Sequence, residues 1–276
     1  MKYRIGFVSV IAISFLILVC LPGEYALAES EEAPSKAPPA EKTIDIDGVK
    51  LVMVEIPAGE FLMGSTFPGN IKHEYPQHKV IISKPFYLGK YEVTQMQWTK
   101  VMGNNPSFFK RKRTEGPRPV EDVSWNDAQE FITKLNGMTG QKFRLPTEAE
   151  WEYACRAGST TKYFFGDDME GLEEYAWYMD NSNYRSHPSG LKKPNPFGLY
   201  DILGNVWEWC SDRYGSKYYS ASPETDPKGP NSGKYHIVRG GGWHWPGMGL
   251  RSAHRYYHES THKYANIGLR LAMDKE

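Results

Sequence analysis

The chain has few cysteines and no excess of charge of either sign. Only three of its 276 residues are cysteine, and Cys20 lies in an apolar N-terminal segment. Cys155 and Cys210 remain, too few for a disulfide scaffold but enough for one bond, and the sequence leaves their pairing open. Lysine and arginine together number 33, as do aspartate and glutamate, so the formal net charge is zero. Nothing in this balance indicates binding to nucleic acid or to acidic lipid.

The one long apolar run is N-terminal. A short positive start precedes the run at 5–21, and Ala26-Leu27-Ala28 has the small-x-small pattern of a cleavage site. These features predict a signal peptide over residues 1–28, cleaved after Ala28, and a periplasmic or secreted protein. Lipidation at Cys20 is a less favoured alternative, because the residue before it is bulky, and an uncleaved anchor is a third. Only in those two cases would the chain be attached to a membrane.

Residues 29–42 are mostly Pro, Ala, Glu and Lys and have almost nothing to bury. They predict a flexible linker. Neither an internal repeat nor a second linker follows, so residues 43–276 are expected to form a single domain.

Alternating apolar residues predict short strands at both ends of this domain. Those at 52–56 and 61–64 are expected to form one hairpin-like pair, and those at 80–82 and 86–88 another. Two closing strands are expected near 237–243 and 267–272.

Capping residues predict three short helices between these strands. Thr94, Ser124 and Thr147 each precede a helical pattern and have a polar or acidic partner three residues later. The helices are expected to end near Gly103, Gly137 and Gly158. Beyond them, about a hundred residues rich in Gly, Pro, Asn and aromatics lack periodicity, and a stretch of this kind is either functional or buried support. The chain is therefore predicted to be α+β with little regular secondary structure.

Seven short motifs occur between residues 61 and 270. They are Phe61-Leu62-Met63-Gly64-Ser65, Tyr91-Glu92-Val93-Thr94, Pro119-Val120-Glu121-Asp122-Val123-Ser124-Trp125, Arg144-Leu145-Pro146-Thr147-Glu148-Ala149-Glu150-Trp151-Glu152, Gly204-Asn205-Val206-Trp207-Glu208-Trp209, Val238-Arg239-Gly240-Gly241 and Gly268-Leu269-Arg270. In this order they resemble the formylglycine-generating enzyme (sulfatase-modifying factor) superfamily. The resemblance covers the chain beyond the linker and implies a variant of the C-type lectin fold.

The resemblance also bears on copper. The name-giving enzymes oxidise a cysteine of a sulfatase peptide to formylglycine, with copper held by two cysteines. The matching window here, residues 240–255, contains no cysteine. Because Cu(I) prefers thiolates, copper is not expected and formylglycine synthesis by the known route is not predicted.

The same window supplies the candidate pocket residues, Trp243, His244, Trp245, Arg251 and Arg255. A histidine can act as a base, and an arginine can hold a carboxylate. The alternative is that the aromatic residues pack under the closing strands.

Two weaker metal hypotheses involve histidine. His244 with Met248 offers soft ligands, and His254, His258 and His262 have a spacing that would align them on a helix. The resemblance instead places residues 256–265 in a surface loop, which favours solvated histidines.

The resemblance implies a calcium site between Asp201 and Glu208. In family structures this stretch wraps the ion, and the matching ligands are the side chains of Asp201 and Glu208 with the carbonyls of Gly204 and Val206. Such hard oxygen ligands suit calcium. The alternative is that Glu208 pairs with an arginine such as Arg239 or Arg270.

Three functions follow. The favoured hypothesis is an exported member without the copper cysteines that acts on or binds an unidentified periplasmic protein, peptide or small molecule. The second is a binding module on a C-type lectin-like scaffold, and the third is formylglycine synthesis by an altered site that includes Cys210.

Overall fold

The computed structural model of the chain describes residues 39–66, 72–110 and 116–275. The predicted signal peptide, Cys20 and most of the predicted linker lie outside these residues. The described residues belong to one unit, which spans 38–276. No helix in the described part of the chain is long and apolar enough to cross a membrane.

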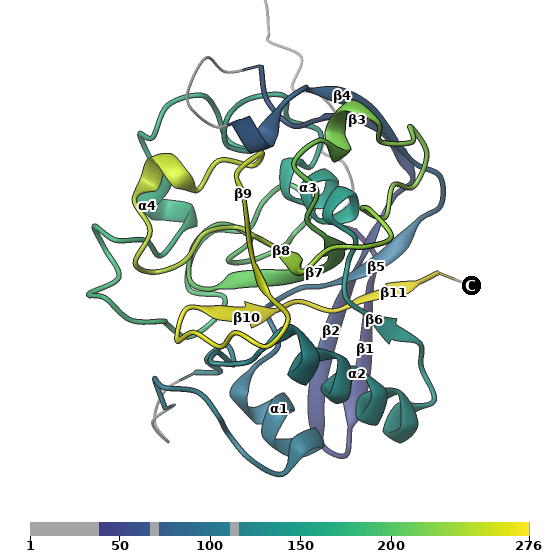
Figure 1. Ribbon diagram of the computed structural model, residues 1–276. Helices are drawn as coiled ribbons and strands as arrows, with labels where there is room; N and C mark the ends of the chain where they lie inside the picture. The colour runs from purple at the N-terminus through teal and green to yellow at the C-terminus, as the bar shows by residue number, and fades with distance from the viewer. Residues whose placement is uncertain (1–38, 67–71, 111–115, 276) are drawn as a thin grey trace, which may run out of the picture. The chain divides into compact units, whose positions relative to one another are not determined.

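The strands of the described residues form three sheets (Figure 1). A five-stranded sheet has the order β1 (Glu41–Ile46), β2 (Val49–Ile56), β5 (Phe86–Gly89), β11 (Ala272–Asp274) and β6 (Phe143–Arg144). A four-stranded sheet has the order β10 (Ile267–Leu269), β7 (Trp207–Arg213), β8 (Tyr235–Arg239) and β9 (Arg255–Glu259). A two-stranded sheet joins β3 (Gly59–Met63) to β4 (His78–Ile82).

The predicted hairpin pairs are wrong, although all four strands exist. β2 pairs with β1 and with β5, whereas β3 pairs with β4. β1 begins at Glu41, inside the predicted linker, and turns into β2 through Asp47 and Gly48. Both turn residues have positive φ, at 46° and 89°, which suits a tight hairpin turn.

The three predicted helices are α1 (Gln95–Met102), α2 (Trp125–Thr139) and α3 (Glu148–Arg156), and a short α4 (Leu172–Tyr175) follows them. Thr94, Ser124 and Thr147 each form a capping box, as predicted. The predicted end of α2 is wrong, because the helix continues through Gly137 and ends at Gly140, whose φ of 67° closes it.

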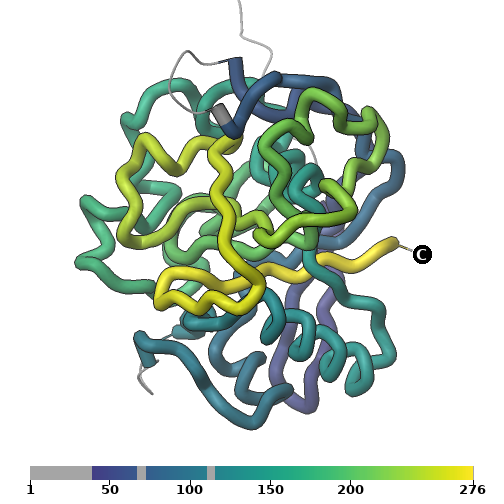
Figure 2. Tube along the Cα trace, in the orientation of Figure 1, coloured from purple at the N-terminus to yellow at the C-terminus, as the bar shows by residue number. Residues whose placement is uncertain are grey.

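Helices α1 and α2 pack against β1 and β2 of the five-stranded sheet (Figure 1). Trp98 of α1 stacks on Phe131 of α2, with ring centroids 4.9 Å apart. Helix α3 packs between the small sheet and the four-stranded sheet, and its Trp151 is fully buried. The chain's last strands reach back into this core: β11 lies between β5 and β6, and β10 lies beside β7 (Figure 2).

The described residues contain 19% helix and 27% strand, and the predicted α+β class is confirmed. Two strands fall where loops were expected. β7 occupies the second half of the Gly-Asn-x-Trp motif and is buried on both faces, so it lacks the alternation typical of a surface strand. β9 takes up residues that were expected in a surface loop, and it also removes the helix that would have aligned His254, His258 and His262.

Candidate functional site

Eight aromatic rings form a continuous series of contacts, which we call the aromatic path. Its members are Phe108, Phe109, Trp243, His244, Trp245, Tyr256, His258 and Tyr264. Successive ring centroids are 4.8–6.0 Å apart, the range of favourable aromatic pairs. The path therefore gathers rings from the loop after α1, the turn after β8, strand β9 and the loop before β10.

Backbone contacts fix the middle of the path. Gly240 and Gly241 have φ of 94° and 79°, so the chain turns sharply after β8. Trp243 Nε1 then donates to the carbonyl of Ala265 at 3.0 Å, and the Asn266 amide lies 2.9 Å from the His244 ring. Burial lowers the pKa of His244, which is therefore neutral near pH 7.

One end of the path is held by a buried carboxylate. The amides of Phe108 and Phe109 donate to Glu121 at 3.0 and 2.8 Å. Burial raises the pKa of Glu121 to about 7, although these hydrogen bonds favour its charged form. The Phe108 ring is left 71% exposed, so the loop presents an apolar side chain to solvent.

Tyr256 and Tyr264 are exposed as well, at 42% and 43%, whereas Trp243, His244 and Trp245 are half-buried. An exposed group of large aromatic side chains on a folded domain is typical of a recognition surface. Of the predicted pocket residues, the structure brings Trp243, His244 and Trp245 together on this surface. The sequence reading missed Phe108 and Tyr264, because only the fold brings their loops to the turn after β8.

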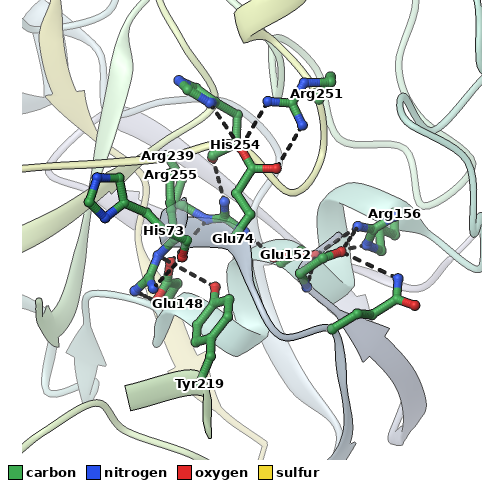
Figure 3. A network of polar contacts seen from close by, with 12 residues as sticks. His73, Glu74, Glu148, Glu152, Arg156, Tyr219, Arg239, Arg251, His254 and Arg255 are labelled. Atoms are coloured by element: carbon green, nitrogen blue, oxygen red, sulfur yellow. Dashed lines mark hydrogen bonds and ion pairs between the residues drawn. The ribbon is translucent and has the colours of Figure 1, made fainter. Parts of the chain in front are cut away.

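Arg251 and Arg255 lie elsewhere, in a buried network of ion pairs (Figure 3). Arg251 makes a bidentate pair with Glu74, at 2.6 and 2.8 Å. Arg255 donates to Glu148 at 2.7 Å. Both guanidinium groups are thus occupied by carboxylates of the same chain, and Arg251 also lines a small pocket of about 120 Å³.

The rest of the network is also buried, although Arg156 lines the same small pocket as Arg251. Glu152 accepts from Arg156 at 2.9 Å and from Arg239, and all three are buried. Burial opposes ionisation of Glu74, but hydrogen bonds from His254 and Arg251 hold the pKa of Glu74 below its ordinary value. The network drawn in Figure 3 is thus a set of buried ion pairs within the chain, and we interpret it as part of the structural core.

The predicted calcium segment is strongly bent. Asp201, Gly204 and Asn205 have φ of 52°, 83° and 54°. A side chain on Gly204 would approach the Trp177 carbonyl within 2.4 Å, so only glycine fits there. The Asp201 Oδ2 accepts from the amide of Gly190 at 2.7 Å, while Asp201 Oδ1 is buried without a partner.

Glu208 makes the arginine pair that was the alternative to calcium binding. Its two oxygens accept from Arg270 at 2.7–3.1 Å, and Oε2 also accepts from Trp151 Nε1 at 2.7 Å. The two predicted carboxylate ligands therefore differ in their hydrogen bonding. Asp201 has one buried oxygen without a hydrogen-bond donor, whereas both oxygens of Glu208 accept hydrogen bonds.

A carboxylate outside the predicted set lies close to Asp201. Glu92 is fully buried, accepts from Ser189 Oγ at 2.8 Å and leaves Oε1 without a partner. Burial raises the pKa of Glu92 well above its ordinary value, and it raises that of Asp201 to about 6. Within the described residues, no three or more His, Cys, Asp or Glu side chains form a ready metal cluster.

Both cysteines of the described residues are free and buried. Burial raises the pKa of the Cys155 thiol to about 12 and that of Cys210 well above its ordinary value. Neither thiol therefore has the thiolate character of a redox or catalytic cysteine.

A groove of about 670 Å³ opens on another part of the domain, lined by the turn between β4 and β5, the start of α2, the start of α3 and the end of β11. Trp125 and the Arg144–Glu150 ion pair lie along it. The groove lining includes no member of the aromatic path.

The sequence was compared with known protein families. The family model of the sulfatase-modifying factor enzyme 1-like domain matches residues 43–275. The chain belongs to this family. The family resemblance of the seven motifs is thereby confirmed.

Curated relatives of the sulfatase-modifying factor family differ in their names. The chain is 33% identical to the chaperone protein LppX of Paenibacillus barcinonensis, over 62% of this chain and 74% of that protein. It is 30% identical to the formylglycine-generating enzyme of Streptomyces coelicolor, over 69% of this chain and 78% of that protein. It is 31% identical to the serine/threonine-protein kinase pkn1 of Chlamydia pneumoniae, over 94% of this chain but only 42% of that protein.

Among solved structures, Treponema denticola variable protein 1 has a TM-score of 0.79 and 31% identity, over 86% of this chain and all of that chain. The fold of this family member is therefore the C-type lectin-like variant that the motifs predicted.

Proposed function

We propose that this chain recognises a polypeptide through the aromatic path. The observation that carries the proposal is the continuity of the path, with exposed Phe108, Tyr256 and Tyr264 along half-buried tryptophans. Aromatic side chains anchor protein interfaces, because they bury much apolar area and have few rotamers to lose.

The chemistry of the path favours a peptide with apolar side chains. The polar groups beside its rings are uncharged, because His244 is neutral and Asn266 is an amide. The two predicted pocket arginines are already paired, Arg251 with Glu74 and Arg255 with Glu148. An acidic ligand would find no free guanidinium from this pair, but apolar side chains can stack on the rings. The names of two relatives, a chaperone protein and a formylglycine-generating enzyme, agree with a polypeptide ligand.

Binding is favoured over turnover. The two described cysteines are buried with raised pKa values, so an altered formylglycine site that includes Cys210 has no accessible nucleophile in this structure. We place this binding in the periplasm or outside the cell, on the strength of the N-terminal sequence pattern.

Calcium is proposed as a structural ion near Asp201. The support is the buried, unpartnered Oδ1 of Asp201 on a backbone bent by three left-handed residues. A buried carboxylate oxygen without a donor is costly, and an oxygen-preferring cation would satisfy it. The bend also turns the segment that carries the carbonyls of Gly204 and Val206, which remain the proposed main-chain ligands. Glu208, the fourth ligand of the family set, is held by Arg270 in this structure.

The binding proposal is tested on an array of synthetic peptides of varied sequence, probed with the purified chain. Phe108→Ala and Tyr256→Ala remove exposed rings from the path, and Met138→Ala removes an exposed apolar side chain from α2 as the matched control. Wild type is expected to bind peptides rich in apolar and aromatic residues. Each path variant should weaken binding about tenfold or more with its melting temperature nearly unchanged, whereas the control should bind like wild type. The proposal fails if no peptide binds, or if path and control variants behave alike.

A further inference from the structure

The carboxylates around Arg270 outnumber the cations buried with them. Glu92, Asp201 and Glu208 are each at most 1% exposed, as is Arg270. If all three acids are ionised, the cluster carries two negative charges in excess. Lys192, whose charge also acts on Asp201, is only partly buried and lies over the Trp177 ring. Buried charges of this kind persist only when they are paired or coordinate a metal.

Four of the five N–H groups of Arg270 already have acceptors other than Glu92 and Asp201. Nε and Nη2 donate to Glu208, Nη1 donates to the Gly89 carbonyl at 2.8 Å, and Nη2 also donates to the Tyr200 carbonyl at 2.8 Å. Glu208 is therefore the acid that Arg270 binds directly. Among the described residues, no hydrogen bond joins Arg270 to Glu92 or Asp201.

The two remaining acids are oriented by neighbouring residues. Ser189 Oγ donates to one oxygen of Glu92, and the amide of Gly190 donates to one oxygen of Asp201. The other oxygen of each acid is buried and has no partner among the described residues. Two consecutive residues thus fix both carboxylates and leave one acceptor free on each.

We infer that a calcium ion bridges Glu92 and Asp201, and that Glu92 takes the acidic role that the family pattern gives to Glu208. This inference rests on the calcium ion proposed above and names its second carboxylate. One divalent cation cancels the excess of two negative charges and supplies both orphaned oxygens with a partner. Calcium fits better than magnesium, because magnesium retains several waters and this cluster is closed to solvent.

The bridge joins parts of the chain that are distant in sequence. Glu92 lies between β5 and α1, Ser189 and Gly190 lie in the long loop after α4, and Asp201 opens the segment that leads into β7. Since β7 leads the chain to the aromatic path through β8, the ion would stiffen the scaffold beneath that surface.

The test compares the purified full-length chain after chelator treatment with the same protein in calcium chloride. Metal content is measured by inductively coupled plasma mass spectrometry, and stability by thermal unfolding. Wild type should bind one calcium, and its melting temperature should rise by about 5–10 °C at a concentration 100 times Kd. Glu92→Gln and Asp201→Asn remove one charge each at constant shape, and Glu121→Gln alters a buried carboxylate outside the cluster as the matched control.

The inference predicts a dependence on calcium that a packing role would not produce. In chelator, Glu92→Gln should melt no lower than wild type, because one oxygen of Glu92 has no partner among the described residues and the amide loses no contact there. In calcium it should melt lower, with calcium affinity reduced about tenfold or more. The control should keep the wild-type calcium response.

The outcomes separate this inference from the proposed ion. If wild type neither binds calcium nor gains stability, both are overturned. If Asp201→Asn loses the response while Glu92→Gln keeps it, the calcium ion stands and the role of Glu92 is overturned. If Glu92→Gln melts below wild type in chelator as well as in calcium, with unchanged calcium affinity, Glu92 is a packing residue and the inference falls.

Discussion

Arg251 provides the sharpest test of the difference between a ligand anchor and a structural arginine. The sequence placed it among pocket residues, whereas the structure pairs it with Glu74, whose side chain is completely buried. Replacing Arg251 with methionine keeps much of the side-chain volume but removes both hydrogen bonds to the carboxylate. Glu74 would then keep only the contact with His254 Nδ1 at 3.2 Å.

The expected cost follows from the burial of the pair. Removing one partner of a buried ion pair leaves an uncompensated charge and costs about 3–5 kcal/mol in free energy of unfolding. For a domain of this size, that corresponds to a fall in melting temperature of about 6–20 °C. Glu74→Gln in the Arg251→Met background removes the stranded charge and should recover at least about 1.5 kcal/mol.

The assay is urea unfolding of wild type, both single variants and the double variant at pH 7, followed by tryptophan fluorescence. The pKa of Glu74 is held below its ordinary value of 4.5, so the stability from this pair is present above pH 4.5 and lost as pH falls below it. The deficit of Arg251→Met should therefore shrink in acid. The reasoning is refuted if Arg251→Met costs less than about 1 kcal/mol, or if the double variant is no more stable than Arg251→Met alone.

Three further predictions concern two glycines, one buried aspartate and the two described cysteines. Gly204→Ala should lower the free energy of unfolding by more than about 3 kcal/mol, because its Cβ would meet the Trp177 carbonyl. Gly137→Ala in α2 places its Cβ in open space and should raise the free energy of unfolding by about 1 kcal/mol. Equal effects of the two variants in urea unfolding would contradict this prediction. Burial raises the pKa of Asp212 to about 7, so it stabilises the fold at low pH and loses this contribution as pH rises from about 4 through 7. Asp212→Asn should therefore show a flatter loss of stability between pH 5 and 8 than wild type, and an unchanged pH slope would argue against a titrating Asp212. Cys155 and Cys210 should not react with a thiol reagent in the native protein but should both react in denaturant, and rapid native labelling would show that the buried positions open.

Local sequence signals predicted the helices better than the strand pairing. Thr94, Ser124 and Thr147 mark the helix starts because a capping box is built from residues three positions apart. The pairing of β2 with β5, which skips two strands, and of β5 with β11 depends on residues far apart in the chain, which no local pattern encodes. The family motifs predicted the fold because their order along the chain matches that of a family, and this order covers the domain from residue 61 to residue 270.

The site shows the same division. Trp243, His244 and Trp245 lie together on one surface because they are adjacent in the chain and follow the glycine turn. The role of Arg251 could not be predicted, because its partner Glu74 lies 177 positions away. Glu92 stood in a motif that the sequence reading had noted, but only the structure shows that one of its oxygens is left without a donor beside Asp201.

The place of β11 has a consequence for the integrity of the largest sheet. Ala272–Asp274 sits between β5 and β6, and no other described strand joins these two in the sheet. Three residues therefore connect the two-residue strand β6 to the rest of this sheet. Removing them would separate β6 from β5 and leave β6 without a partner among the described strands.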